Sequence, residues 1–150
     1  MWIKNILKTS SSSSVILIRI VVGAVFLSEG IQKFLFPGAL GVGRFIKIGI
    51  PTPEFFAPFV GVVEILFGLL ILIGLLTRIA AIPLIINIGV AIISTKIPIL
   101  LNEGFWKMAH EARTDFSMLL GSIFLLIVGA GKISIDAFIS DKKDKGMHDD

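Results

Sequence analysis

Four long apolar segments dominate the chain, and polar stretches separate them. They cover residues 15–36, 55–76, 79 to about 95, and 115 to about 131. A membrane-spanning helix needs about 20 predominantly apolar residues, with a range of roughly 17–25. The pattern therefore predicts an all-α membrane protein built as a four-transmembrane-helix bundle.

The connections between these segments differ in length. Only Thr77 and Arg78 separate the second segment from the third, which predicts an antiparallel helical hairpin. Residues 37–54 are rich in glycine and proline and read as a structured, turn-rich loop, and residues 96–114 read as a second loop. We expect one domain at residues 15–138, between a polar N-terminal segment (residues 1–14, able to supply a helix N-cap) and a charged, mobile tail (residues 139–150).

Composition supports this class. The 150 residues are 55% hydrophobic and 17% charged, and the mean hydropathy is +0.94. A soluble domain of this length could not bury so much apolar surface. The absence of cysteine excludes disulfides, thiolate metal sites and covalently attached haem. The net charge of +3 forms no basic stripe, so nucleic acid is not an expected partner. Of the two histidines one lies in the tail, and we expect no metal site.

Basic residues near the ends of the spans indicate orientation. The side that holds both termini carries seven of them: Lys4, Lys8, Arg78, Lys132, Lys142, Lys143 and Lys145. The opposite side carries four: Arg44, Lys47, Lys107 and Arg113. This difference favours both termini in the cytoplasm, and the opposite side is called the outer side below.

The most informative polar residue is Glu64, the only charge in residues 55–76. An ionisable group at the centre of a span costs roughly 2.5–3.5 kcal/mol, so such a group marks a functional site by default. With a rise of about 1.5 Å per residue, the predicted topology places seven further polar side chains in the same outer half of the bundle. The resulting candidate ligand-binding set is Glu29, Lys33, Glu64, Asn87, His110, Glu111, Arg113 and Asp115.

The spacing of these residues suggests how they are held. Glu29 and Lys33 are four residues apart and are able to pair on one helix face. Gly61 and Gly68 lie one turn on either side of Glu64, as a tight helix-packing seam around a carboxylate requires. Gly23 and Gly30 form a matching stripe on the first span, and His110 lies in the second predicted loop.

A second polar group lies toward the inner end. Arg19 is one turn into the first span, Arg78 follows the hairpin turn, and Asp136 follows the fourth span. We interpret this group as structural charge pairing, with Arg19 or Arg78 bound to Asp136.

Three blocks of the sequence together resemble the DoxX family of small four-helix prokaryotic membrane proteins. They are RIVVGAVFLSEGIQKF, GIPTPEFFAPFVGVVEILFGLLILIGLLTRIAA and HEARTDFSMLLGSIFLLIVGAGKISID. The matching signature positions are Arg19, Gly30, Lys33, Pro51, Glu64, Gly74, Thr77, Arg78, Asp115, Gly131, Ser134 and Asp136. The resemblance implies a location in the prokaryotic plasma membrane. It also implies a role as a membrane subunit of a thiosulfate:quinone oxidoreductase or quinol-oxidase system, or as an anchor in an oxidative-stress assembly.

Three functions fit this reading. The first is an oxidoreductase subunit that interacts with quinone through a polar pocket in the outer half of the bundle, with Glu64 as candidate proton carrier and electrons from a partner protein. The second is a non-catalytic scaffold that anchors redox or stress-response proteins. The third, least favoured because no inverted repeat is visible, is a small transporter. The partners expected are the lipid bilayer, a redox protein and a second copy of the chain, with a quinone as the only cofactor and none bound covalently.

Overall fold

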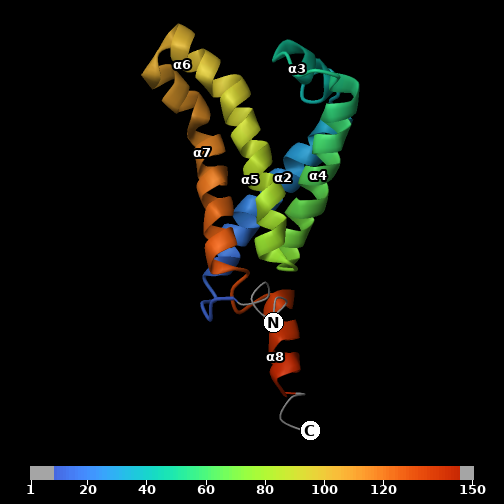
Figure 1. The fold of residues 1–150 in the computed structure, drawn as a ribbon, viewed down its shortest axis with the longest axis vertical. Helices are drawn as coiled ribbons and strands as arrows, with labels where there is room; N and C mark the ends of the chain where they lie inside the picture. Colours follow the sequence, from blue (N-terminus) through green and yellow to red (C-terminus); the bar gives the residue numbers. More distant parts are fainter. Residues whose placement is uncertain (1–8, 146–150) are drawn as a thin grey trace.

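The computed structural model describes residues 9–145, and within that range it contains helices, turns and no strand (Figure 1). The predicted all-α class is therefore confirmed. In chain order the helices are α2 (Val15–Leu35), α3 (Val42–Lys47), α4 (Pro53–Ile73), α5 (Thr77–Ala91), the π-helical segment η1 (Ile92–Lys96), α6 (Ile97–Glu103), α7 (Phe105–Val128) and α8 (Ile135–Lys145).

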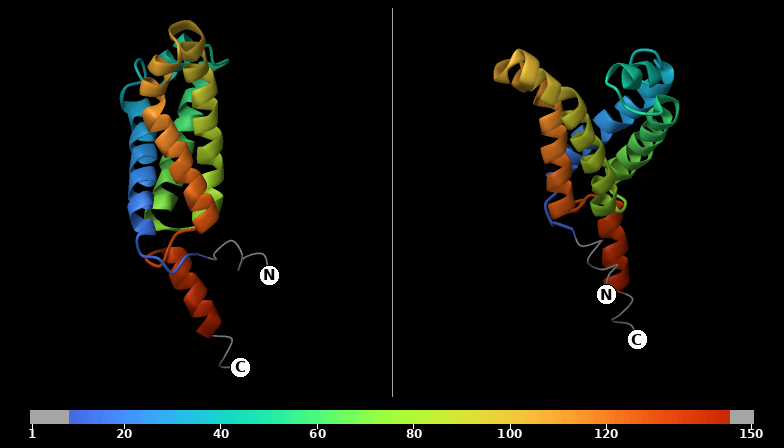
Figure 2. Two further views of the ribbon diagram at one scale, coloured as in Figure 1. Left: turned by 90° about the vertical axis from the view of Figure 1, so that its left-hand side faces the viewer. Right: turned by 45° about the horizontal axis from the view of Figure 1, so that its top comes forward.

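The long helices form a ring in which α2 packs on α4, α4 on α5, α5 on α7, and α7 on α2. We call α2 with α4 the first arm, and α5, η1, α6 and α7 the second arm. The arms lie together near α8, at the inner end, and splay apart toward α3 and α6, at the outer end (Figures 1 and 2). The two arms therefore share one closed end and one open end.

The first arm is held by glycines, as the sequence predicts. A Cβ added to Gly30 would lie 2.7 Å from the carbonyl oxygen of Gly61, and one added to Gly23 would lie 2.8 Å from that of Gly68. Such distances are too short for any side chain, so the backbones of α2 and α4 touch at both places. This close packing fixes the face of α4 that α2 covers.

The second arm differs from its prediction. The helix that begins at Thr77 does not end near Thr95 but continues through η1 and α6 to Glu103, so the loop expected at residues 96–114 is wrong. The chain turns only at Gly104, whose φ of +86° suits glycine. Pro98 has no N–H to donate to the preceding turn, and the hydroxyls of Ser94 and Thr95 bond back to the carbonyl of Ala91. These changes widen the helix into a π turn rather than stopping it.

Three segments in the described range are long and apolar enough to cross a membrane: Val15–Leu35, Pro53–Ile73 and Thr77–Glu103. The fourth predicted span lies within α7, which begins ten residues before the predicted start at Asp115. Its outer turns carry Lys107, Glu111 and Arg113, which interrupt the apolar pattern.

The predicted hairpin between α4 and α5 is present. Gly74 ends α4 with a φ of +71°, and Leu76, also with positive φ, precedes α5. Within the turn-rich loop the chain adds the short helix α3. The tail was expected to be mobile, but its first part belongs to the helix α8. The Ser134 hydroxyl accepts the main-chain N–H of Ala137 and caps the first turn of this helix. Residues 146–150 of that tail lie outside the described range.

Candidate functional site

The outer half of the bundle holds a carboxylate that is almost fully enclosed. Glu64 lies on α4, and only 5% of its surface is exposed. It projects from the same face as Gly61 and Gly68, where α2 packs most closely. The glycine seam therefore determines which side chains of α2 are able to reach it.

Two side chains from different helices bind this carboxylate. The Lys33 ammonium on α2 lies 2.5 Å from one Glu64 oxygen. The Asn87 amide on α5 donates to the other oxygen over 2.7 Å. The Lys33 and Glu64 side chains are 10% and 6% exposed, so water screens this ion pair little. Three helices thus meet at one hydrogen-bonded group, which we call the Glu64 cluster.

The predicted pair of Glu29 with Lys33 is not formed. The Lys33 ammonium instead contacts the main-chain oxygen of Glu29 at 3.5 Å and uses its charge on Glu64. Glu29 is exposed and makes no ion pair with any residue in the described part of the chain. The reason is the close approach of α2 and α4, which offers Lys33 a buried partner across the interface rather than an exposed one on its own helix.

Chemically, the Glu64 cluster combines one proton-carrying group with two hydrogen-bond donors. A carboxylate both holds and releases a proton, an ammonium stabilises negative charge, and an amide fixes orientation without changing charge. The cluster is therefore suited to bind a polar group that accepts hydrogen bonds and to exchange a proton with it.

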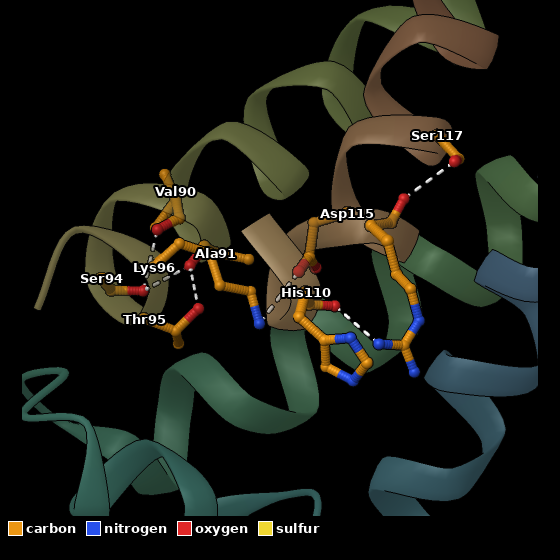
Figure 3. Close-up of polar contacts among 9 residues, drawn as sticks. Val90, Ala91, Ser94, Thr95, Lys96, His110, Asp115 and Ser117 are labelled. Carbon is orange, nitrogen blue, oxygen red and sulfur yellow. Dashed lines mark hydrogen bonds and ion pairs between the residues drawn. The ribbon is translucent and has the colours of Figure 1, made fainter. Parts of the chain in front are cut away.

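The second arm has its own ion pair. Lys96, the last residue of η1, lies 3.0 Å from the Asp115 carboxylate on α7, and both side chains are largely buried (Figure 3). Asn87 and Lys96 are nine residues apart on one continuous helix, a separation of roughly 13 Å along its axis. The structure therefore places Asp115 in a separate pair, and not with Glu64 as the sequence led us to expect.

The other three candidate residues of α7 are exposed. His110 lies in a helix rather than the predicted loop, and its carbonyl accepts a bond of 2.7 Å from the Arg113 guanidinium (Figure 3). Glu111 pairs with Lys107 one turn earlier, at 3.3 Å. That hydrogen bond, together with the positive charge of Lys107, lowers the pKa of Glu111 from its ordinary value. None of these three side chains binds the Glu64 cluster within the described residues.

At the inner end, Arg19 is 2% exposed and binds carbonyls instead of a carboxylate. Its guanidinium donates to Ile71 (2.9 Å) and Leu72 (2.6 Å) at the end of α4. It also donates to Ala130 (3.1 Å) and Ile133 (2.5 Å) just after α7. The last carbonyls of a helix lack partners within it and carry partial negative charge, so one cation binds the end of α4 and also the connection that follows α7.

Asp136 performs the opposite task at the same end. Its two carboxylate oxygens accept the main-chain N–H groups of Leu76 (2.7 Å) and Thr77 (3.0 Å), where α5 begins. Arg78 donates to the carbonyl of Leu126 over 2.8 Å. The prediction was a pair of Asp136 with Arg19 or Arg78. The Arg19 guanidinium instead binds main-chain carbonyls and Asp136 binds the start of α5, although the charges of Arg19 and Asp136 still attract each other. Gly74 leaves the space, because a Cβ there would lie 2.6 Å from the Arg19 guanidinium carbon.

Sequence reasoning missed one buried charge. Lys96 was expected at the edge of a span, yet it is buried because the π turn directs it toward α7. The available signal was Pro98, two residues later, which marks a place where regular helical bonding fails. Among the described residues, no group of three or more histidine, aspartate or glutamate side chains is placed to hold a metal ion.

Comparison with known proteins finds a matching family model and similar sequences. The sequence model of the DoxX family matches residues 14–97, which include α2, α4, α5 and the whole Glu64 cluster. The chain is 55% identical over 144 residues to "Uncharacterized membrane protein Rv3486" of Mycobacterium tuberculosis, and the matched region covers 92% of this chain and 88% of that protein. It is 30% identical over 132 residues to "Putative oxidoreductase CatD" of Bacillus subtilis, and the matched region covers 87% of this chain and 90% of that protein. No solved structure matches the chain.

Proposed function

Starting from the fact that this chain belongs to the DoxX family of membrane proteins, we propose that it is a four-span subunit of an oxidoreductase system that interacts with a quinone. In this proposal α7 is the fourth span, both termini face the cytoplasm, and the membrane is the prokaryotic plasma membrane. The observation that carries the proposal is the Glu64 cluster, a buried carboxylate held by one ammonium and one amide. The relative named as an oxidoreductase adds independent support.

The donor set of the cluster fits a quinone head group. Reduction of a quinone to a quinol consumes two electrons and two protons, and its two ring oxygens accept hydrogen bonds. Lys33 and Asn87, which donate to Glu64 in the structure, supply the donors when the head group binds. Glu64 is the group that carries a proton to a ring oxygen. Electrons come from a partner protein with its own redox centre, so the chain is a subunit and not an enzyme by itself.

A scaffold function is the second candidate, and one observation favours it. Both donors are already directed at the Glu64 carboxylate, so the cluster also ties α2, α4 and α5 together without any ligand. In that case the loops and the tail anchor redox or stress-response proteins, and the buried charges serve packing alone.

Quinone binding distinguishes the two candidates. Purified protein in lipid nanodiscs is titrated with a quinone analogue, and wild type is compared with Glu64→Gln, which keeps the shape but removes the titratable group. Glu54→Gln, a change of the same kind at an exposed position on α4, is the control. We expect saturable binding that weakens roughly tenfold in Glu64→Gln, the effect of losing about 1.4 kcal/mol.

The same experiment is able to contradict the proposal. If wild type does not bind the analogue, or if Glu64→Gln binds it as well as Glu54→Gln does, the quinone proposal fails. A Glu64→Gln protein that unfolds at a much lower temperature, without any change in binding, would favour the scaffold.

A further inference from the structure

Two opposite charges on facing helices have no partner in the splayed arrangement. Glu29 on α2 and Arg113 on α7 are both exposed, and neither forms an ion pair within the described residues. Arg113 only donates to a carbonyl of its own helix. Among the described residues, the buried and half-buried charges of the outer half are paired, since Lys33 binds Glu64 and Lys96 binds Asp115.

The contact between α2 and α7 sets the height of these two charges along the bundle. The helices touch where Val22 meets Gly121, because a Cβ on Gly121 would lie 2.6 Å from a Val22 methyl carbon. Glu29 follows Val22 by seven residues, two helical turns, and so lies on the same face of α2, about 10 Å further out. Arg113 precedes Gly121 by eight residues, about 12 Å further out on α7. The two charges are therefore at the same height above a common contact.

Each arm is stiffened internally, and the arms are joined to each other by the hydrogen bond from Asn87 on α5 to Glu64 on α4, so movement between them is concentrated outward of that bond. The glycine contacts and the Lys33–Glu64 pair join α2 to α4, and the Lys96–Asp115 pair joins η1 to α7. At the inner end Arg19 binds carbonyls that follow both α4 and α7. A change in the angle between α2 and α7 would thus move their outer turns most and their inner ends least.

In a bilayer the splayed arrangement exposes charge at a costly depth. Glu29 lies six residues before the end of α2, about 9 Å inside the span. A lone carboxylate or guanidinium at such a depth is expensive unless it is paired or hydrated. Bringing α7 toward α2 would pair both charges at once and cover the polar side chains of the outer turns of α7.

We propose that α2 and α7 form a gate at the outer end of the bundle, which closes when Glu29 pairs with Arg113, and that the splayed arrangement is its open state. The proposal concerns the two arms themselves and holds whether or not the Glu64 cluster binds a quinone.

Distance measurements between spin labels on the two arms test the gate. The chain has no cysteine, so labels attach only where cysteine is introduced. Leu35→Cys in α2 and Leu101→Cys in α6 are suitable because these side chains are 65% and 78% exposed. In lipid nanodiscs we expect a short and a long distance. Glu29→Gln should lower the ratio of short to long roughly fivefold or more, the range typical of a coupling between two sites.

The exchange Glu29→Arg with Arg113→Glu should restore the short distance, and Glu103→Gln, an exposed carboxylate on α6, should leave it unchanged. A single long distance in wild type would overturn the gate, as would a ratio that neither Glu29→Gln nor Arg113→Gln alters. A short distance that disappears when labelled protein is diluted with unlabelled protein would also overturn it, because the charges would then pair between two copies.

Discussion

Replacement of Arg19 by methionine should weaken the fold more than any surface change, and the structure allows the loss to be worked out. The variant keeps a long side chain but removes the guanidinium bonds to the carbonyls of Ile71, Leu72, Ala130 and Ile133. A typical intramolecular hydrogen bond contributes about 1 kcal/mol net, so four lost bonds give about 4 kcal/mol. For a domain of this size, at roughly 2–4 °C per kcal/mol, the unfolding temperature should fall by roughly 8–16 °C.

The assay is thermal unfolding of purified protein in detergent, followed by circular dichroism. Lys132→Met removes an exposed cation from the same end of the bundle and serves as the control. Arg19→Lys keeps the charge but has three donors on one nitrogen instead of a planar fork, so it should lose about half as much stability. If Arg19→Met unfolds within about 3 °C of Lys132→Met, Arg19 does not hold the inner ends together and our reasoning is wrong.

Two further predictions follow from the packing. Gly68→Ala should destabilise the protein by about 2 kcal/mol or more, because the new Cβ would lie 2.8 Å from the main-chain nitrogen of Leu27. Gly89→Ala, which has open space around it, is the control and should stabilise α5 by up to about 1 kcal/mol, so equal unfolding temperatures for the two variants would contradict the close contact of α2 with α4. Lys96→Met should destabilise the protein by about 3 kcal/mol because it leaves the Asp115 charge uncompensated, and adding Asp115→Leu should recover most of that loss. If thermal unfolding shows the double variant to be no more stable than Lys96→Met alone, the two charges are not coupled.

Much of the helical architecture could be predicted from the sequence, because a helix that crosses a membrane needs a long run of apolar residues. The predicted apolar runs 15–36 and 55–76 match α2 and α4 to within three residues at each end, and the glycine seam follows from small residues one turn apart. The sequence also singled out Glu64, because a charge inside such a run is rare. Local patterns of this kind survive folding because each helix must satisfy its own backbone bonds in lipid.

The partners of the charges could not be predicted in the same way. Glu29 is the nearest opposite charge to Lys33 along the chain, yet Lys33 binds Glu64, 31 residues away, because two backbones touch. The π turn at η1 depends on a local balance of lost and gained bonds that no hydrophobic period reports. Such features depend on three-dimensional packing, and sequence spacing within one helix says little about contacts between helices.

The bonds of Arg19 also bear on how the protein is assembled during synthesis. Its four carbonyl partners follow it by 52, 53, 111 and 114 residues, so they emerge from the ribosome in two groups. Once α4 has been made, α2 and α4 are able to pair through their glycines, but half of the guanidinium bonds must wait until α7 is complete. The last long helix to be made therefore completes the environment of a charge in the first, and a ribosome that stops after α6 would leave an inserted but unfinished bundle.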